Sequence, residues 1–213
     1  MEDLKLLKEE VNNLAEVLKK IEARGTVSGR ILKFLYFQLL DSYRLAIMAI
    51  GTYNFGLSST IFTAEVIEVL ARNVVEKAIL CAYIKEKNDT VFIDQFLKTS
   101  ASEFEKSWEI EYFSEDKNLQ VKNLPDYKTM SNCLDIETYK TFKKLSYLSH
   151  PRFTLPYSLV EHEYIEKRKT TKMDFYIKRG RNALGVIAQA LKIVRKKFEE
   201  SDKELLMEKI LPA

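Results

Sequence analysis

Apolar residues recur at helical spacing from the start of the chain. Over residues 3–24 they alternate spacings of three and four without a break, a narrow stripe typical of a coiled-coil seam. Gly25 marks the end of this helix. The stripe consists of Leu4, Leu7, Val11, Leu14, Leu18 and Ile21. It predicts an amphipathic, coiled-coil-like helix over residues 1–25. This helix either packs on the protein's own core or binds a partner protein or a second copy through residues 4–21.

The next two segments are apolar around most of their circumference, which predicts buried helices. The first follows Ser28, a good N-cap residue, and runs to about Tyr53. The second, which we expect at the centre of the fold, runs from Thr60 to Ile84, about seven turns. Asn54 and Gly56 interrupt the pattern between them. Because this connection is short, the two helices should pack antiparallel.

Helical patterns continue to the end of the chain, and no segment predicts a strand. The further helices expected are Val91–Tyr112, a helix or helical turn over Asp126–Cys133, Asp135–Ser149, Leu159–Lys169, Met173–Glu200 and a tail helix Lys203–Ile210. We therefore predict an all-α fold, in which residues 26–213 form one bundle domain of six to eight helices behind the N-terminal helix.

Composition agrees with this fold class. The chain of 213 residues is 46% hydrophobic and 31% charged, and it holds only 6 glycines and 4 prolines, too few for the many turns of a barrel or sandwich. The acidic N-terminus is no signal peptide, and Lys33, Asp41 and Arg44 interrupt the longest apolar run, so we expect no membrane span. Two cysteines, Cys81 and Cys133, fit a cytoplasmic protein with reduced thiols.

Several familiar site motifs are absent. The chain has no glycine-rich phosphate loop, no HExxH, no CxxC and no nucleophile elbow. We therefore predict neither a metal nor a cofactor.

The central helix carries three charged residues in one row. Glu68, Arg72 and Glu76 are four apart, so they stack on one face and predict a Glu–Arg–Glu ladder on a largely apolar helix. Such a ladder is either a structural ion-pair network or the lining of a polar functional site, because buried charge is costly and often serves function.

A second candidate site lies near residue 150. His150 precedes a proline, so it falls at or just past a helix end, where the helix dipole favours the imidazolium. Ser146 lies one turn earlier and Arg152 two residues later. A histidine beside a hydroxyl and a cation suits general acid–base chemistry on a phosphodiester. The alternative is a histidine that only caps the helix.

The C-terminal part of the chain is rich in basic residues. Lysine and arginine dominate residues 167–197, where the candidates for nucleic-acid contact are Lys167, Arg168, Lys169, Lys178, Arg179 and Arg181. Tyr164, Phe175 and Tyr176 are interleaved with them, a composition compatible with RNA contact. A solvated helix face that offsets the acidic residues 103–116 is the alternative. The net charge of +3 does not by itself indicate nucleic acid.

Two segments resemble a group of uncharacterised bacterial all-helical proteins. AEVIEVLARNVVEKAILCAYI resembles their R…E helix, and YKTFKKLSYLSHPRF resembles their Y…LS…HP helix end. The resemblance covers roughly residues 35 to 160. It carries over to the matching positions Arg72, Glu76, Tyr139, Ser146 and His150.

That group is similar in style to the HEPN helical bundles of toxin–antitoxin and anti-phage systems, many of which are dimeric, metal-independent ribonucleases. The HEPN hallmark is an arginine followed, four to six residues later, by a histidine. Here Lys144 stands at that spacing before His150, and Arg152 follows it. The departure fits an inactive relative, or a site that combines Arg72 and His150 from two helices.

Two hypotheses follow. In the first, the protein is an HEPN-like member of a bacterial defence or toxin system that binds or cleaves RNA. His150 is the general acid–base, Arg72 or Arg152 stabilises phosphate charge, and Glu76 and Ser146 complete the site. In the second, it is a non-catalytic interaction or oligomerisation module whose polar core is structural.

Overall fold

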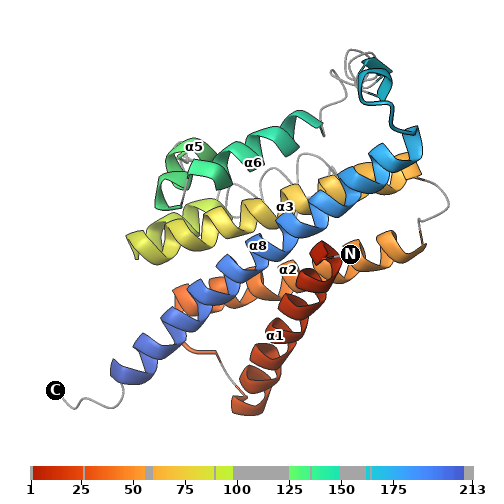
Figure 1. Ribbon diagram of the computed structural model, residues 1–213. Helices are drawn as coiled ribbons and strands as arrows, with labels where there is room; N and C mark the ends of the chain where they lie inside the picture. The colour runs from red at the N-terminus through yellow and green to blue at the C-terminus, as the bar shows by residue number, and fades with distance from the viewer. Residues whose placement is uncertain are drawn as a thin grey trace, which may run out of the picture.

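The computed structural model describes residues 2–25, 27–55, 60–88, 90–97, 125–134, 136–148, 162–163 and 165–208. Every regular element in these ranges is helical, so the predicted all-α fold is confirmed for this part of the chain. Four long helices make up the main bundle: α1 (Glu2–Arg24), α2 (Arg30–Phe55), α3 (Thr60–Lys87) and α8 (Lys172–Glu208). Figure 1 shows α8 running across α2 and α3, with α1 to its side, and α3 running back antiparallel to α2, as predicted.

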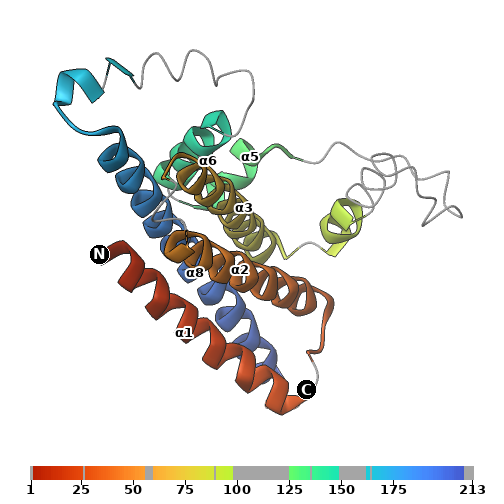
Figure 2. The same cartoon turned by 90° about the vertical axis from the view of Figure 1, so that its right-hand side faces the viewer.

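Shorter elements cover the side of α3 that faces away from α1. They are α5 (Tyr127–Met130), the 3₁₀ turn η2 (Ser131–Cys133) and α6 (Ile136–Leu148), and all three pack on α3 (Figures 1 and 2). Asp126 caps α5, because its side chain accepts a hydrogen bond of 2.7 Å from the Thr129 amide. The predictions of a helical turn near Asp126–Cys133 and of a helix over Asp135–Ser149 are confirmed to within a residue or two.

Two other predicted helices are described only in part. Residues 90–97 are helical, and Phe92 and Phe96 pack there against Tyr83 and Phe34, as an aromatic core stripe should. The remainder of the predicted Val91–Tyr112 helix lies outside the described residues. Residues 162–163 and 165–168 are helical within the predicted segment Leu159–Lys169.

The apolar stripe of α1 packs inside its own chain. Leu7, Val11, Leu14, Leu18 and Ile21 are buried, and Leu4 is partly buried against the same core. They contact α8 and α2, beside which α1 runs in Figure 2. Of the two alternatives for this stripe, the structure shows the intramolecular one, so these side chains are not displayed on the surface.

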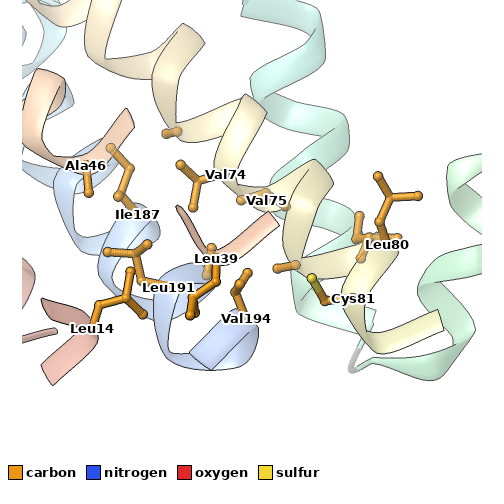
Figure 3. Packing of buried hydrophobic residues seen from close by; sticks show 14 of the residues in the cluster. Leu14, Leu39, Ala46, Val74, Val75, Leu80, Cys81, Ile187, Leu191 and Val194 are labelled. Carbon is orange, nitrogen blue, oxygen red and sulfur yellow. The ribbon is translucent and has the colours of Figure 1, made fainter. Parts of the chain in front are cut away.

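The core lies where α1, α2, α3 and α8 meet. Figure 3 shows Leu14 of α1, Leu39 and Ala46 of α2, Val74 of α3, and Ile187 and Leu191 of α8 facing one another. All six side chains are fully buried. The central position predicted for α3 is confirmed, because it packs on α2, on α8 and on the α5–α6 layer. Cys81 is buried in the same core.

The predicted N-cap of α2 is off by one residue, and the predicted break near residue 201 is wrong. We expected Ser28 to cap α2, but the carbonyl of Gly29 accepts the first helical hydrogen bond, from the Lys33 amide at 3.0 Å. Gly29 has φ +87°, a conformation that glycine adopts without strain. We also expected a break near residue 201, but α8 continues to Glu208. The Ser201 hydroxyl donates to the Lys197 carbonyl and Asp202 pairs with Arg24 of α1, so both polar side chains are satisfied within a continuous helix.

None of the helices in the described part of the chain is both long enough and apolar enough to cross a membrane.

Candidate functional site

The three charged residues of the predicted ladder lie on one face of α3. We call Glu68, Arg72 and Glu76 the α3 polar strip. In Figure 1, α8 lies on one side of α3 and α6 on the other, and both helices pack on it. The strip therefore lies between α8 and α6. Glu68 contacts α8, and Arg72 contacts α6.

Glu68 binds a residue of α8. Arg179 donates from Nε to Glu68 Oε1 at 2.9 Å and from an amino nitrogen to Oε2 at 2.6 Å, a bidentate pair. The Glu68 side chain is 8% exposed and that of Arg179 is 11% exposed, so the pair is almost fully removed from water. The guanidinium also lies over the rings of Phe175 and Tyr176, with centroid distances of 5.8 and 5.4 Å.

The continuous Glu–Arg–Glu ladder that we predicted is thus wrong in one half. Both oxygens of Glu68 bind the guanidinium of Arg179, because α8 brings an arginine with a planar donor fork against this carboxylate. Spacing within α3 can identify only partners within α3, so the sequence pattern could not show this pair.

Arg72 and Glu76 form the other half as predicted. Arg72 donates from Nε to Glu76 Oε1 at 3.2 Å, and the closest approach of the pair is 3.1 Å. Both side chains are half-buried, and the guanidinium lies 6.0 Å from the ring centroid of Phe142 in α6. Burial raises the pKa of Glu76 above its ordinary value, although the neighbouring Arg72 acts to lower it.

The α3 polar strip is electrically balanced by these contacts. Together with Arg179 of α8, the strip combines two carboxylates with two guanidiniums, and each carboxylate is bound by one guanidinium. Such an arrangement stabilises helix packing and orients Arg72 toward α6. A reaction at the strip would need a general acid–base in addition, and His150 is the residue predicted for that role.

The remaining residues of the predicted catalytic site are placed only in part. Ser146 lies in the last described turn of α6, one turn after Phe142, but its side chain is outside the described part of the structure. His150 and Arg152 lie outside the described residues. Tyr139 is in α6 and partly buried against the core. The structure therefore brings Arg72 and Glu76 together and sets α6 beside them.

The basic residues divide into an exposed set and a buried residue. Lys167, Arg168, Lys169 and Lys178 are exposed, whereas Arg179 is buried against Glu68. Lys169 has φ +49°, and its amide and that of Thr170 donate to the carbonyls of Glu166 and Ile165, the hydrogen-bond pattern that closes a helix end. The chain thus turns sharply here and re-enters a helix at Lys172.

Arg181 is held by a residue that the sequence analysis did not identify. Its Nε donates to the hydroxyl of Tyr53 in α2 at 3.1 Å, and this bond raises the pKa of Arg181. Phe142, the ring beside Arg72, was also missed. The sequence gives no signal for Tyr53 or Phe142, because each lies on a different helix from the arginine that it contacts.

Metal and thiol chemistry find no support in the described residues. No group of three or more histidine, cysteine, aspartate or glutamate side chains there could hold a metal ion. Cys81 and Cys133 are both free thiols. Burial raises the pKa of Cys81 to about 12, and partial burial together with a hydrogen bond to Glu86 raises that of Cys133 to about 11, so neither is an activated nucleophile.

Comparisons of the chain with protein families, with characterised proteins and with solved structures find no match in any of the three.

Proposed function

We propose that this protein acts on RNA in the cytoplasm, as an HEPN-like helical bundle of a bacterial defence or toxin system. The observation that carries the proposal is an exposed set of cations where the chain enters α8. We call it the α8 basic surface; it consists of Lys167, Arg168, Lys169, Lys172 and Lys178. Over residues 167–181 the sequence has seven basic side chains and a single acid, Asp174.

This surface suits the backbone of a nucleic acid. Exposed lysines and arginines neutralise phosphates and release counterions, which gives affinity without a reading of base sequence. The half-buried ring of Phe175 lies in the first turn of α8, next to these cations, and packs on the buried ring of Tyr176. In a single-stranded nucleic acid the bases are unpaired, so they can stack on an aromatic side chain while the phosphates contact nearby cations. We therefore expect the surface to bind a single strand.

Cleavage, if the protein performs it, is proposed to use His150 as general acid–base and Arg72 or Arg152 to stabilise phosphate charge. The position of Arg72 supports this assignment in part. Its guanidinium is half-buried beside α6, and Ser146 follows Phe142 by one turn of that helix.

Binding is tested with a fluorescently labelled single-stranded RNA at several salt concentrations. We expect Lys167→Gln, Arg168→Gln, Lys169→Asn and Lys178→Gln together to weaken binding at low salt; Asn suits the positive φ of residue 169. Four lost phosphate contacts should reduce the slope of log K against log salt by about 3. The matched control replaces Lys5, Lys8, Lys192 and Lys196, all exposed and outside the surface, by Gln. Equal losses in both variants would contradict the α8 basic surface.

Cleavage is tested on a mixed RNA pool with chelator present, using the wild type and His150→Ala. Cleavage that is lost only in the variant supports the nuclease. Binding without cleavage by either protein leaves an RNA-binding module. If the wild type neither binds nor cleaves RNA, the proposed function is wrong.

The second candidate function is a non-catalytic interaction module, and one observation favours it. The charges of the α3 polar strip are bound to each other and to Arg179, as expected for a structural network. Because the stripe of α1 is buried in the same chain, such a module would bind its partner through another face. An α3 strip with a structural role alone predicts that Arg72→Met lowers stability and leaves RNA binding unchanged.

A further inference from the structure

One face of α2 carries large apolar side chains that the other described residues leave exposed. Phe37 is 63% exposed, Met48 is 56% exposed and Phe55 is 90% exposed, and Ile47 beside them is also exposed. These residues belong to the same helix whose opposite face is buried against α3, α8 and α1. Large exposed apolar residues gathered along one helix face commonly mark an interaction surface.

The exposed positions follow a heptad pattern. Phe37, Asp41, Arg44 and Met48 are separated by steps of four, three and four, and Phe55 follows Met48 by one full heptad. Steps that alternate between three and four keep residues in one line on a helix, which is the geometry of a coiled-coil seam. We call these five residues the α2 seam.

The two charges in the α2 seam are placed unequally. Arg44 is exposed and makes no ion pair or hydrogen bond with any described residue. Asp41 is bound to Lys77 of α3 through one oxygen, yet its side chain remains 50% exposed. Between Phe37 and Met48 the seam thus presents Arg44, which has no partner among the described residues, and Asp41, whose side chain is half exposed.

We propose that the α2 seam binds the α2 seam of a second copy of this chain, antiparallel, about a two-fold axis between residues 42 and 43. In this register residue i faces the residue whose number is 85 minus i. Phe37 then meets the partner's Met48, a favourable sulfur–aromatic contact, and Asp41 meets the partner's Arg44. Each contact occurs twice, as an isologous interface requires.

The charges of the α2 seam indicate both what binds it and in which orientation. A parallel pair would place Arg44 against Arg44 and Asp41 against Asp41, which repel. The antiparallel register pairs every charge with its opposite and gives Arg44 the partner that it lacks among the described residues of its own chain. The same register brings Phe55 level with the partner's Arg30, whose guanidinium binds Asp94 of its own chain through one amino group and can offer its planar face to the ring. This self-complementarity favours a second copy over an unrelated protein.

The proposal goes beyond the proposed function, since it requires no RNA and involves none of the residues of the α8 basic surface or of the α3 polar strip. It is tested by sedimentation velocity of the full chain without RNA, over micromolar to near-millimolar concentrations. We expect a concentration-dependent dimer. Arg44→Asp and Asp41→Arg should each weaken it at least about tenfold, because two ion pairs per dimer become like-charge contacts.

Mixing the two variants gives the sharpest outcome. The Asp41→Arg chain then carries two cations and the Arg44→Asp chain two carboxylates, so a mixed dimer regains both pairs while neither variant pairs with itself. Recovery of association in the mixture is expected. A wild type that stays monomeric throughout, or a dimer that neither variant weakens, would overturn the proposal.

Asp41→Arg also removes the ion pair with Lys77 and can therefore lower the stability of the monomer. A second measurement tests the interface without changing Asp41. In a Cys133→Ser background, Phe37→Cys with Met48→Cys should form a disulfide-linked dimer on mild oxidation, because the two positions face each other across the axis. Either cysteine alone should not, since it lies about 16 Å along the helices from its own copy. Equal cross-linking of all three proteins would contradict the register.

Discussion

The pair formed by Glu68 and Arg179 should be the most costly single contact in the described structure to break. Its two hydrogen bonds measure 2.9 and 2.6 Å, and both side chains are almost fully buried. With an effective dielectric constant of about 20 and charge centres about 4 Å apart, the attraction is about 4 kcal/mol. Removing one partner leaves the other charge buried, which costs about 3–5 kcal/mol. Arg179→Met should therefore lower the unfolding free energy by that amount.

The double variant separates the pair from its surroundings. Glu68→Gln with Arg179→Met removes both charges and retains their approximate volumes, so it should cost less than the two single changes added together. We expect a coupling free energy of about 2–3 kcal/mol. Urea denaturation followed by far-UV circular dichroism measures all four proteins. In a chain of this size, a loss of 3 kcal/mol lowers Tm by about 6–12 °C.

The control is the exposed pair of Glu16 and Lys19 in α1, whose atoms approach within 2.8 Å. The corresponding variants, Glu16→Gln and Lys19→Met, should show a coupling of less than about 0.5 kcal/mol, because water screens exposed pairs. A coupling at residues 68 and 179 no greater than this control, in proteins that fold, would refute the argument that burial makes the pair strong.

Three further predictions concern buried and partly buried polar groups. The Ser42 hydroxyl is buried without a hydrogen-bond partner among the described residues, so Ser42→Ala should raise the unfolding free energy by about 1 kcal/mol in urea denaturation; a loss would contradict the assignment. Burial raises the pKa of Glu76, so the folded state favours its protonated form. The stability of the wild type relative to Glu76→Gln should therefore increase as the pH falls from above that raised pKa to about 4.5. Denaturation at a series of pH values measures this difference, and a decrease in it would contradict the prediction. The thiols of Cys81 and Cys133 have pKa values raised to about 12 and about 11, so a thiolate reagent at pH 8 should label Cys133 slowly and Cys81 only after unfolding; fast labelling of Cys81 in the folded protein would contradict its burial.

Helix positions could be predicted because they depend on local pattern. The stripe of α1 predicts its five buried residues, and the run Asp135–Ser149 predicts α6 to within one residue at each end. The boundaries that failed were those at which two local signals compete. Ser28 and Gly29 can both begin a helix, and Ser201 can either end a helix or bond to the carbonyl four residues earlier.

The candidate site could be predicted only where its members share a helix. Arg72 and Glu76 are one turn apart, so spacing alone indicates their contact. The structure also shows that Arg179, predicted to contact RNA, is bound to Glu68 inside the bundle, while its neighbour Lys178 is exposed. Adjacent basic residues on a helix point in different directions, and composition does not reveal which of them faces the core.

The sequence by itself determined the fold class, the central place of α3 and the apolar faces of the helices, because these follow from periodicity and composition. Tertiary structure alone decided which charges became partners and which apolar face remained open. Glu68 and Arg179 are 111 positions apart, and Phe37 has the same character in the sequence as its buried neighbour Leu39. The physical reason is that ion pairs and burial depend on distance in space, which the packing of helices remote in the chain establishes.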